Sequence, residues 1–232
     1  LAEDLDIMET TKARIDTAKN INLYMYRSLS YSYILILQSK YSVDAKIDEL
    51  RDIYIKSMHY FLQAFNKRNP IYADILNYVS LGVLLNIPDN NFRQLIDYVK
   101  QMDKQAKPSG WTPDLLLWFM LNSRMKEQEK QKYAETLAYP RLYNGLYKVI
   151  QAPNAAAAKD ALCKYLDRWY NLNSNAPWYN SHLKDNSYRG YWAWEVAAVA
   201  KIMHIDDSDL KNNQYYPYDM VHWADNETTA KE

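Results

Sequence analysis

The sequence predicts an all-α protein, a bundle of roughly eight to ten helices in two packed halves, given the usual lengths of helices and connections. Two observations predict this fold class. Apolar residues recur at steps of three and four along most of the chain, and no segment keeps the alternation of a half-buried strand. Only four of the 232 residues are glycine, which disfavours the turn-rich architecture of all-β proteins.

Several helices are expected in the N-terminal half, residues 1–107. The first 40 residues contain no proline or glycine, so they are expected to form one long helix or two helices in line. Apolar stripes at helical spacing predict three further helices, which lie within residues 47–65, 71–83 and 92–102.

The best candidate boundary in the chain is Lys107-Pro108-Ser109-Gly110, and the C-terminal half, residues 112–224, follows it. Its first helix is expected to open with Thr112 as the N-cap, Pro113 at the first helical position and Asp114 as an early acid. The later segments are helices that begin at Pro140 and after Pro153-Asn154, a long helix within 189–210, and a frayed tail over 225–232.

Composition limits the possible functions. Hydrophobic residues make up 48% of the chain, charged residues 24%, and 28 basic residues balance 28 acidic ones. These values are typical of a folded soluble protein, and the zero net charge argues against a general nucleic-acid binder. No apolar run reaches the roughly 18 residues of a membrane span. The single cysteine allows no internal disulfide, so we expect a cytoplasmic protein, although a disulfide-free exported protein would look the same. A removed signal peptide stays open because the chain begins at Leu1 without methionine.

The sequence carries no recognised catalytic motif: it has no glycine-rich phosphate loop, no GxSxG elbow and no HExxH helix. The single cysteine, Cys163, is expected to pack as a small hydrophobe. A metal site built from His204, Asp206 and Asp207 is one interpretation of that segment. The other, which we favour, is a helix C-terminus followed by acids in a turn. We expect no metal and no cofactor.

Glu195 lies near the middle of the apolar arc of the segment 189–210 when this segment is plotted as a helix. A buried carboxylate must be paired, hydrogen-bonded or protonated. It could be a general acid or base with a raised pKa. A structural role, as the acceptor for a tyrosine hydroxyl, an indole N–H, an arginine or backbone amides, is the interpretation we favour, because its neighbours on the arc are aromatic and aliphatic.

Two other stretches are ambiguous. In residues 24–33, YMYRSLSYSY, serines and an arginine interleave with tyrosines, so the stretch could be core, a wet groove or a partner surface. Asp206, Asp207 and Asp209 form a compact acidic cluster. It could be a solvated turn that caps a helix, or an acidic patch that imitates the phosphates of a nucleic acid.

The C-terminal half resembles the PoNi-like immunity proteins, whose members carry a GYW…E helix, an Asp-Asp turn and a YYP-x-D element. The N-terminal half resembles the partner domain of the same family. The matching residues of the C-terminal half are Arg168-Trp169-Tyr170, Trp178, Tyr188-Arg189-Gly190-Tyr191-Trp192-Ala193-Trp194-Glu195, Ile205-Asp206-Asp207-Ser208 and Tyr215-Tyr216-Pro217-Tyr218-Asp219, and those of the N-terminal half are Tyr41-Ser42-Val43-Asp44 and Ser80-Leu81-Gly82-Val83-Leu84-Leu85.

This resemblance implies an all-helical, non-enzymatic antitoxin that binds a cognate DNase toxin of the PD-(D/E)xK type, encoded by an adjacent gene. It implies that the shared motif residues are structural, namely Trp169, Tyr170, Gly190, Tyr191, Trp192, Glu195, Asp206, Asp207, Pro217 and Asp219. A DNase presents a basic face, so exposed acids are the candidate toxin contacts, namely Asp206, Asp207, Asp209, Asp225 and Glu227.

Two other classes of function stay open, and each predicts its own kind of site. An enzyme centred on Glu195 predicts a polar cleft that reaches this residue, with a second titratable group within hydrogen-bond reach. An aromatic-rich module for carbohydrate or peptide binding predicts a row of exposed tyrosine and tryptophan side chains along a groove.

Overall fold

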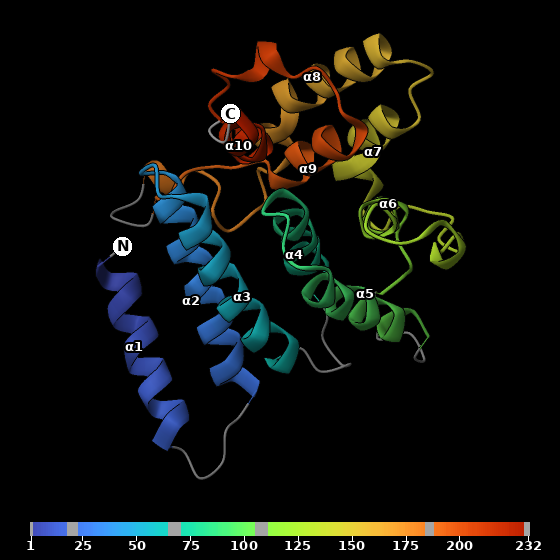
Figure 1. Ribbon diagram of the computed structural model, residues 1–232. Helices are drawn as coiled ribbons and strands as arrows, with labels where there is room; N and C mark the ends of the chain where they lie inside the picture. Colours follow the sequence, from blue (N-terminus) through green and yellow to red (C-terminus); the bar gives the residue numbers. More distant parts are fainter. Residues whose placement is uncertain (1, 18–22, 65–70, 105–110, 184–187, 230–232) are drawn as a thin grey trace. The chain divides into compact units, whose positions relative to one another are not determined.

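The computed structural model describes residues 2–17, 23–64, 71–104, 111–183 and 188–229, and these ranges contain ten α-helices, three short 3-10 helices and no β-strand (Figure 1). The predicted all-α fold class is confirmed. The helices are α1 (Ala2–Thr17), α2 (Leu23–Tyr41), α3 (Ile47–Ala64), α4 (Tyr72–Leu84), α5 (Asp89–Lys104), α6 (Leu115–Asn122), α7 (Pro140–Ile150), α8 (Ala155–Leu172), α9 (Trp194–Met203) and α10 (Tyr218–Thr229), and the 3-10 helices are η1 (Glu127–Glu129), η2 (Ser181–Leu183) and η3 (Ser208–Leu210). None of the described helices combines the length and the apolar character needed to cross a membrane.

The chain forms two compact units. Unit 1 comprises Leu1–Tyr78 and Leu85–Trp111, and unit 2 comprises Val79–Leu84 and Thr112–Glu232. Helix α4 is therefore divided between them, because its residues up to Tyr78 belong to unit 1 and the rest to unit 2.

In unit 1, helices α1, α2 and α3 pack side by side (Figure 1). Met8 of α1 packs against a small core formed by the buried side chains of Leu29 and Tyr33 on α2, and Ile53 and Tyr60 of α3 cover the same core. The expectation of one long helix or two helices in line over the first 40 residues is therefore wrong. Folding α1 back on α2 removes apolar surface from water on both helices, which an in-line arrangement would leave exposed.

In unit 2, helix α9 occupies the centre and contacts α6, α7, α8 and α10. Its alanines and valines are almost fully buried, and small side chains allow helices to approach closely. The segment Val79–Leu84 belongs to the same core. The carbonyl oxygen of Leu84, at the end of α4, accepts hydrogen bonds of 2.9 Å from Lys201 Nζ of α9 and from Trp223 Nε1 of α10. Side chains thus satisfy a backbone acceptor that the helix itself leaves unpaired.

Two helix starts differ from the expected positions. Residues 188–193 are not helical, and α9 begins only at Trp194. Gly190 has a φ of 92°, in the left-handed region that glycine tolerates, and the Ala193 amide donates to the Tyr215 carbonyl at 2.8 Å. A hydrogen bond to a residue that is distant in sequence therefore fixes the end of this segment, and α9 begins at the next residue.

The second difference is at α6, where Asp114 is the N-cap in place of Thr112. Its fully buried carboxylate accepts from the Leu117 amide and the Ala138 amide, both at 2.7 Å. This pairing with residue 138 favours Asp114 because a Thr112 cap could satisfy only local amides. At the other end of the chain, α10 continues through Thr229, into the segment expected as a tail.

Candidate functional site

Glu195 lies in the first turn of α9, and its partner comes from α8. The Trp169 indole Nε1–H donates a hydrogen bond of 2.6 Å to Glu195 Oε1, across 26 residues of sequence. The Glu195 backbone amide interacts with the same carboxyl group. An indole N–H is one of the structural partners expected from the sequence. Because Trp169 cannot exchange a proton at neutral pH, this pair positions two helices and provides no acid–base couple.

The Glu195 carboxyl group is buried although the residue as a whole is partly exposed. Burial raises the pKa of Glu195 to about 7, and the hydrogen bonds from its own amide and from Trp169 only partly oppose this. The carboxylate in turn raises the pKa values of the tyrosines Tyr143 and Tyr165, which burial has already raised. Two hollows of the structure, one of about 450 Å³ beside α2 and one of about 480 Å³ between α7 and α8, are lined by other residues, and Glu195 is not among them.

The motif aromatics form a continuous cluster around Tyr170 of α8. The ring of Tyr170 stacks on that of Tyr215 with centroids 5.2 Å apart, and its hydroxyl donates to Asn180 Oδ1 at 2.8 Å. Trp169 stacks on Trp178 at 5.4 Å, and Tyr191 contacts both Tyr170 and Trp178. Trp169 and Tyr191 are buried, Tyr170 and Tyr215 are half-buried, and Trp178 is exposed. Ring stacking holds the cluster together, and it joins α8 to the loops before α9 and α10.

Asp207 is buried, with 2% of its surface exposed, and its carboxylate is occupied on both oxygens. The Tyr216 hydroxyl donates to Oδ2 at 2.6 Å, and His222 Nε2 lies 2.7 Å from Oδ1. This network joins the turn after α9 to helix α10. Asp207 therefore cannot offer its carboxylate to a partner surface, and its place in the structure is that of an internal anchor.

Asp206 and Asp209 are exposed and share one cation. Lys159 Nζ of α8 lies 2.8 Å from Asp206 Oδ2 and 2.8 Å from Asp209 Oδ2. Asp206 also accepts from the Ser208 amide and hydroxyl, and these interactions, with Lys159 the largest, hold its pKa well below the usual range. The loop is thus both a capped turn and an exposed acidic patch, and Lys159 neutralises one of its two charges.

The remaining predicted residues lie near these two networks. Pro217 is buried just before α10, Asp219 is exposed in the first turn of that helix, and Trp192 contacts Trp194 with ring centroids 6.1 Å apart. Asp225 and Glu227 belong to α10, but their side chains lie outside the described residues.

Within the described part of the chain, no three His, Cys, Asp or Glu side chains gather as a metal ion would require. His204, with a φ of 51°, is the C-cap that follows α9.

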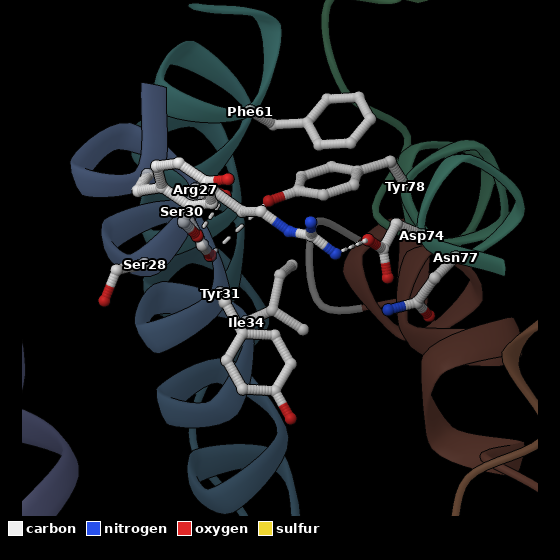
Figure 2. A pocket seen from close by; sticks show the side chains of 10 residues that line it. Arg27, Ser28, Ser30, Tyr31, Ile34, Phe61, Asp74, Asn77 and Tyr78 are labelled. Carbon is white, nitrogen blue, oxygen red and sulfur yellow. Dashed lines mark hydrogen bonds and ion pairs between the residues drawn. The ribbon is translucent and has the colours of Figure 1, made fainter. Parts of the chain in front are cut away.

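A hollow of about 450 Å³ lies in unit 1, and we call it the α2 groove (Figure 2). One wall is a single face of α2, because its residues follow at steps of three and four. Phe61 of α3 and three residues of α4 complete the lining. The full set is Tyr24, Arg27, Ser28, Ser30, Tyr31, Ile34, Phe61, Asp74, Asn77 and Tyr78.

The floor of the α2 groove is fixed by buried hydrogen bonds. The Ser57 hydroxyl donates to the Ser30 carbonyl at 2.8 Å and lies 2.5 Å from the Tyr78 hydroxyl. The ring of Tyr78 stacks on Phe61 with centroids 3.9 Å apart. Ser30 and Ser32 donate back to carbonyls of their own helix. The hydroxyls of Ser30 and Ser32 are therefore satisfied inside, whereas Ser28 is exposed and Tyr24 and Tyr31 are 80% and 60% exposed.

Comparison with known protein families decides what this chain is. The model of the N-terminal domain of PoNe immunity proteins (PoNi) matches residues 4–97, and the model of the C-terminal domain matches residues 112–220. The chain belongs to the PoNe immunity protein family. This is a non-enzymatic family, and its name implies neutralisation of a cognate PoNe toxin. The resemblance seen in the sequence is confirmed.

The fold of this PoNi family member is also found in a solved structure. The chain is similar to the crystal structure of protein PA2201 from Pseudomonas aeruginosa, with a TM-score of 0.73 and 18% sequence identity over 98% of this chain and 87% of that chain. At this level of identity the likeness concerns the fold alone. No curated protein matches the chain.

Sequence reasoning missed several residues of these sites. His222 and Lys159 pair with the acids of the turn, but they lie 15 and 47 residues from their partners, and no local spacing indicates such pairs. Asp74 and Asn77 form a wall of the α2 groove. In the sequence they look like ordinary polar positions on the exposed side of a helix. The tyrosines of 24–33 were the one available signal, because aromatic residues on a serine-rich face have no obvious place in a core.

Proposed function

We propose that this protein neutralises a cognate PoNe toxin, a DNase encoded by an adjacent gene, by forming a stoichiometric complex with it in the cytoplasm. The observation that carries the proposal is the match of both PoNi domain models, over residues 4–97 and 112–220. Neutralisation of a toxin follows from the family. The DNase activity of the toxin and the binding mechanism are the parts that we add.

The local chemistry supports binding in preference to turnover. Glu195, a buried carboxyl group whose pKa is raised, is paired with an indole N–H that cannot act as an acid or base. The enzyme alternative requires a second titratable group within hydrogen-bond reach of it and an open polar cleft. The hydrogen bond of Glu195 to Trp169 instead favours the role of a structural anchor between α8 and α9.

Exposed acids attract the basic face of a DNase and so steer the association of the two proteins. Asp206 and Asp209 can contribute, since their side chains are 69% and 71% exposed, but Lys159 halves their net charge. We keep both as toxin contacts, together with Asp225 and Glu227, and assign Asp207 to the interior. Charges on the rim of an interface act mainly on the association rate, so association should slow as salt rises.

One observation favours a second candidate function. The α2 groove carries two exposed tyrosines, Tyr24 and Tyr31, as a carbohydrate- or peptide-binding module would. Tyrosine is also a common anchor of protein interfaces. Because the chain belongs to an immunity family, we assign the groove to recognition of a protein. Binding of oligosaccharides to the isolated protein, measured by calorimetry, would favour the second candidate.

The deciding experiment titrates the DNA cleavage activity of the toxin with this protein. Co-purification with the product of the adjacent gene comes first and establishes the complex. Inhibition should then reach its limit near one equivalent, without added metal or cofactor for the inhibitor. Inactivation of the toxin that proceeds with time at substoichiometric amounts would show turnover, and the binding mechanism would have to be abandoned.

A further inference from the structure

The α2 groove combines exposed anchors with polar groups that the chain leaves available. Tyr24 and Tyr31 stand seven residues apart, on the same face of α2 after two helical turns, and both are mostly exposed. Arg27 lies between them on that face and reaches Asp74 of α4, with 4.0 Å between Nη2 and Oδ2 (Figure 2). The Tyr–Arg–Tyr face has the residue types that carry most of the binding energy at protein interfaces.

The α4 wall supplies the acceptors. Asp74 and Asn77 are one turn apart on α4 and both line the groove. Among the described residues, Arg27 is the one ionic partner of Asp74, at the outer limit of an ion pair. Burial raises the pKa of Asp74, and Arg27 opposes this shift. The Asp74 side chain is still 37% exposed, so a closer cation can reach a carboxylate that Arg27 holds only loosely.

These features suit a cationic side chain. A carboxylate and an amide oxygen on one wall can accept its N–H groups, and the tyrosine rings opposite can hold its charge by cation–π contact. The other hollow, about 480 Å³ between α7 and α8 in unit 2, has the opposite character. It is lined by four basic residues and one acid, namely Arg141, Lys148, Lys164, Arg168 and Asp160. A basic partner surface would be repelled there.

We propose that the α2 groove is the docking site for the cognate toxin and that it receives an arginine or lysine of the toxin's basic face between Asp74 and Tyr31. This rests on the proposed function, because a nuclease carries such cations where it contacts DNA. A toxin cation that is bound in the groove cannot contact DNA at the same time. Recognition is then centred on unit 1, and the contacts made by Asp206 and Asp209 act mainly on the association rate.

The test measures the affinity of the toxin for groove variants that have native circular dichroism spectra. Tyr31→Ala and Asp74→Asn should each raise Kd at least about tenfold, the usual loss for an interface anchor. Two controls repeat these changes of residue type at positions away from the groove. Tyr133→Ala removes a tyrosine that is 43% exposed in unit 2, and Asp48→Asn removes an exposed acid of α3 in unit 1. Both controls should leave Kd within about twofold of the wild-type value, because surface positions away from an interface contribute little.

Each result decides one point. If the wild-type protein fails to bind the toxin, the proposed function itself is lost. If the wild-type protein binds and both groove variants bind as tightly as the controls, the function stands and the docking site is wrong. If Arg27→Gln weakens binding while Asp74→Asn does not, the occupant is anionic, which overturns the assignment of a cation. A weaker dependence of Kd on salt for Asp74→Asn would support the proposal independently.

Discussion

A single hydrogen bond ties the motif glutamate of α9 to the motif tryptophan of α8, and the cost of burying the carboxyl group of that glutamate is visible in its pKa. The carboxyl group is buried, and its pKa is raised to about 7. Proton uptake and folding are therefore linked. The folded protein retains a proton on Glu195 at pH values where the unfolded chain has already released it.

The sign of this linkage gives a testable pH dependence. Between the ordinary value of 4.5 and about 7, the folded state binds more protons at Glu195 than the unfolded state does. Its contribution to the free energy of unfolding is therefore complete at low pH and falls as pH rises, by at most about 3 kcal/mol. Urea unfolding at pH 5 and pH 8 should show this fall, and Glu195→Gln should lack it. An equal fall in Glu195→Gln would assign the effect to other groups.

The alanine variant provides the matched comparison. Glu195→Ala removes the acceptor of the Trp169 indole and should lower the free energy of unfolding by about 1–3 kcal/mol, the cost of an unsatisfied buried donor. Glu195→Gln keeps an acceptor oxygen and should cost less at neutral pH. If the two variants were equally destabilised, the hydrogen bond would not be what the site requires.

At this scale the sequence could predict the kind of role but not the partners. The apolar surroundings of Glu195 indicated that its carboxyl group must be hydrogen-bonded, and an indole N–H was among the expected donors. Trp169 could not be selected, because it lies 26 residues away and several other aromatic residues were equally plausible. Asp207 shows the same limit. Three neighbouring aspartates look equivalent in sequence, and only the fold decides which one is buried beneath Tyr216 and His222.

At the scale of helices, the end of α4 is held by side chains from two other elements. Lys201 and Trp223 both donate to the buried Leu84 carbonyl. We expect Lys201→Met and Trp223→Phe to cost about 1 kcal/mol each, because one donor remains in either variant. The double variant removes both donors and should cost about 1 kcal/mol more than the sum of the single changes.

A double-mutant cycle of chemical unfolding free energies measures this coupling. Methionine preserves the length of the lysine stem and phenylalanine preserves an aromatic ring, and the packing loss of each single change cancels in the cycle. The pair also has a cation–π contact, with Lys201 Nζ 5.4 Å from the Trp223 ring centroid. That contact would make the double variant cost less than the sum. The sign of the coupling therefore tells which interaction dominates.

Helices themselves were largely predictable, while their starts and partners were not. The stripes within 47–65, 71–83 and 92–102 correspond to α3, α4 and α5 because amphipathic spacing is a local property. The start of α9 and the cap of α6 are set by the Tyr215 carbonyl and the Ala138 amide, which are distant in sequence. The packing of α1 on α2 is equally a tertiary choice.

At the scale of the whole molecule, the division of α4 bears on cooperativity. Because each unit includes part of this one helix, loss of either unit should remove the packing of half of α4. We therefore expect one cooperative thermal transition, with the two halves unfolding together. Six of the seven tryptophans, all but Trp111, belong to unit 2. Tryptophan fluorescence thus reports mainly on unit 2, whereas far-ultraviolet circular dichroism follows every helix.

The two signals should give the same midpoint temperature. A circular dichroism curve that begins to fall at a lower temperature than the fluorescence curve would show unit 1 unfolding first, and the units would then be independent. Limited proteolysis near residues 107–110 provides a second measurement. A nick at this site should leave the two fragments associated.

The same division of α4 constrains how this family can acquire new immunities. A genetic crossover between the two family domains, in residues 98–111, would carry Val79–Leu84 along with the N-terminal part. The C-terminal unit of the recipient would then inherit foreign residues in its own hydrophobic core and a foreign carbonyl for Lys201 and Trp223. Whole-domain shuffling therefore disturbs folding even when recognition is transferred. Gradual substitution on an exposed helix face such as that of α2 changes recognition and leaves the core intact, so point mutation is the easier evolutionary route to a new toxin specificity.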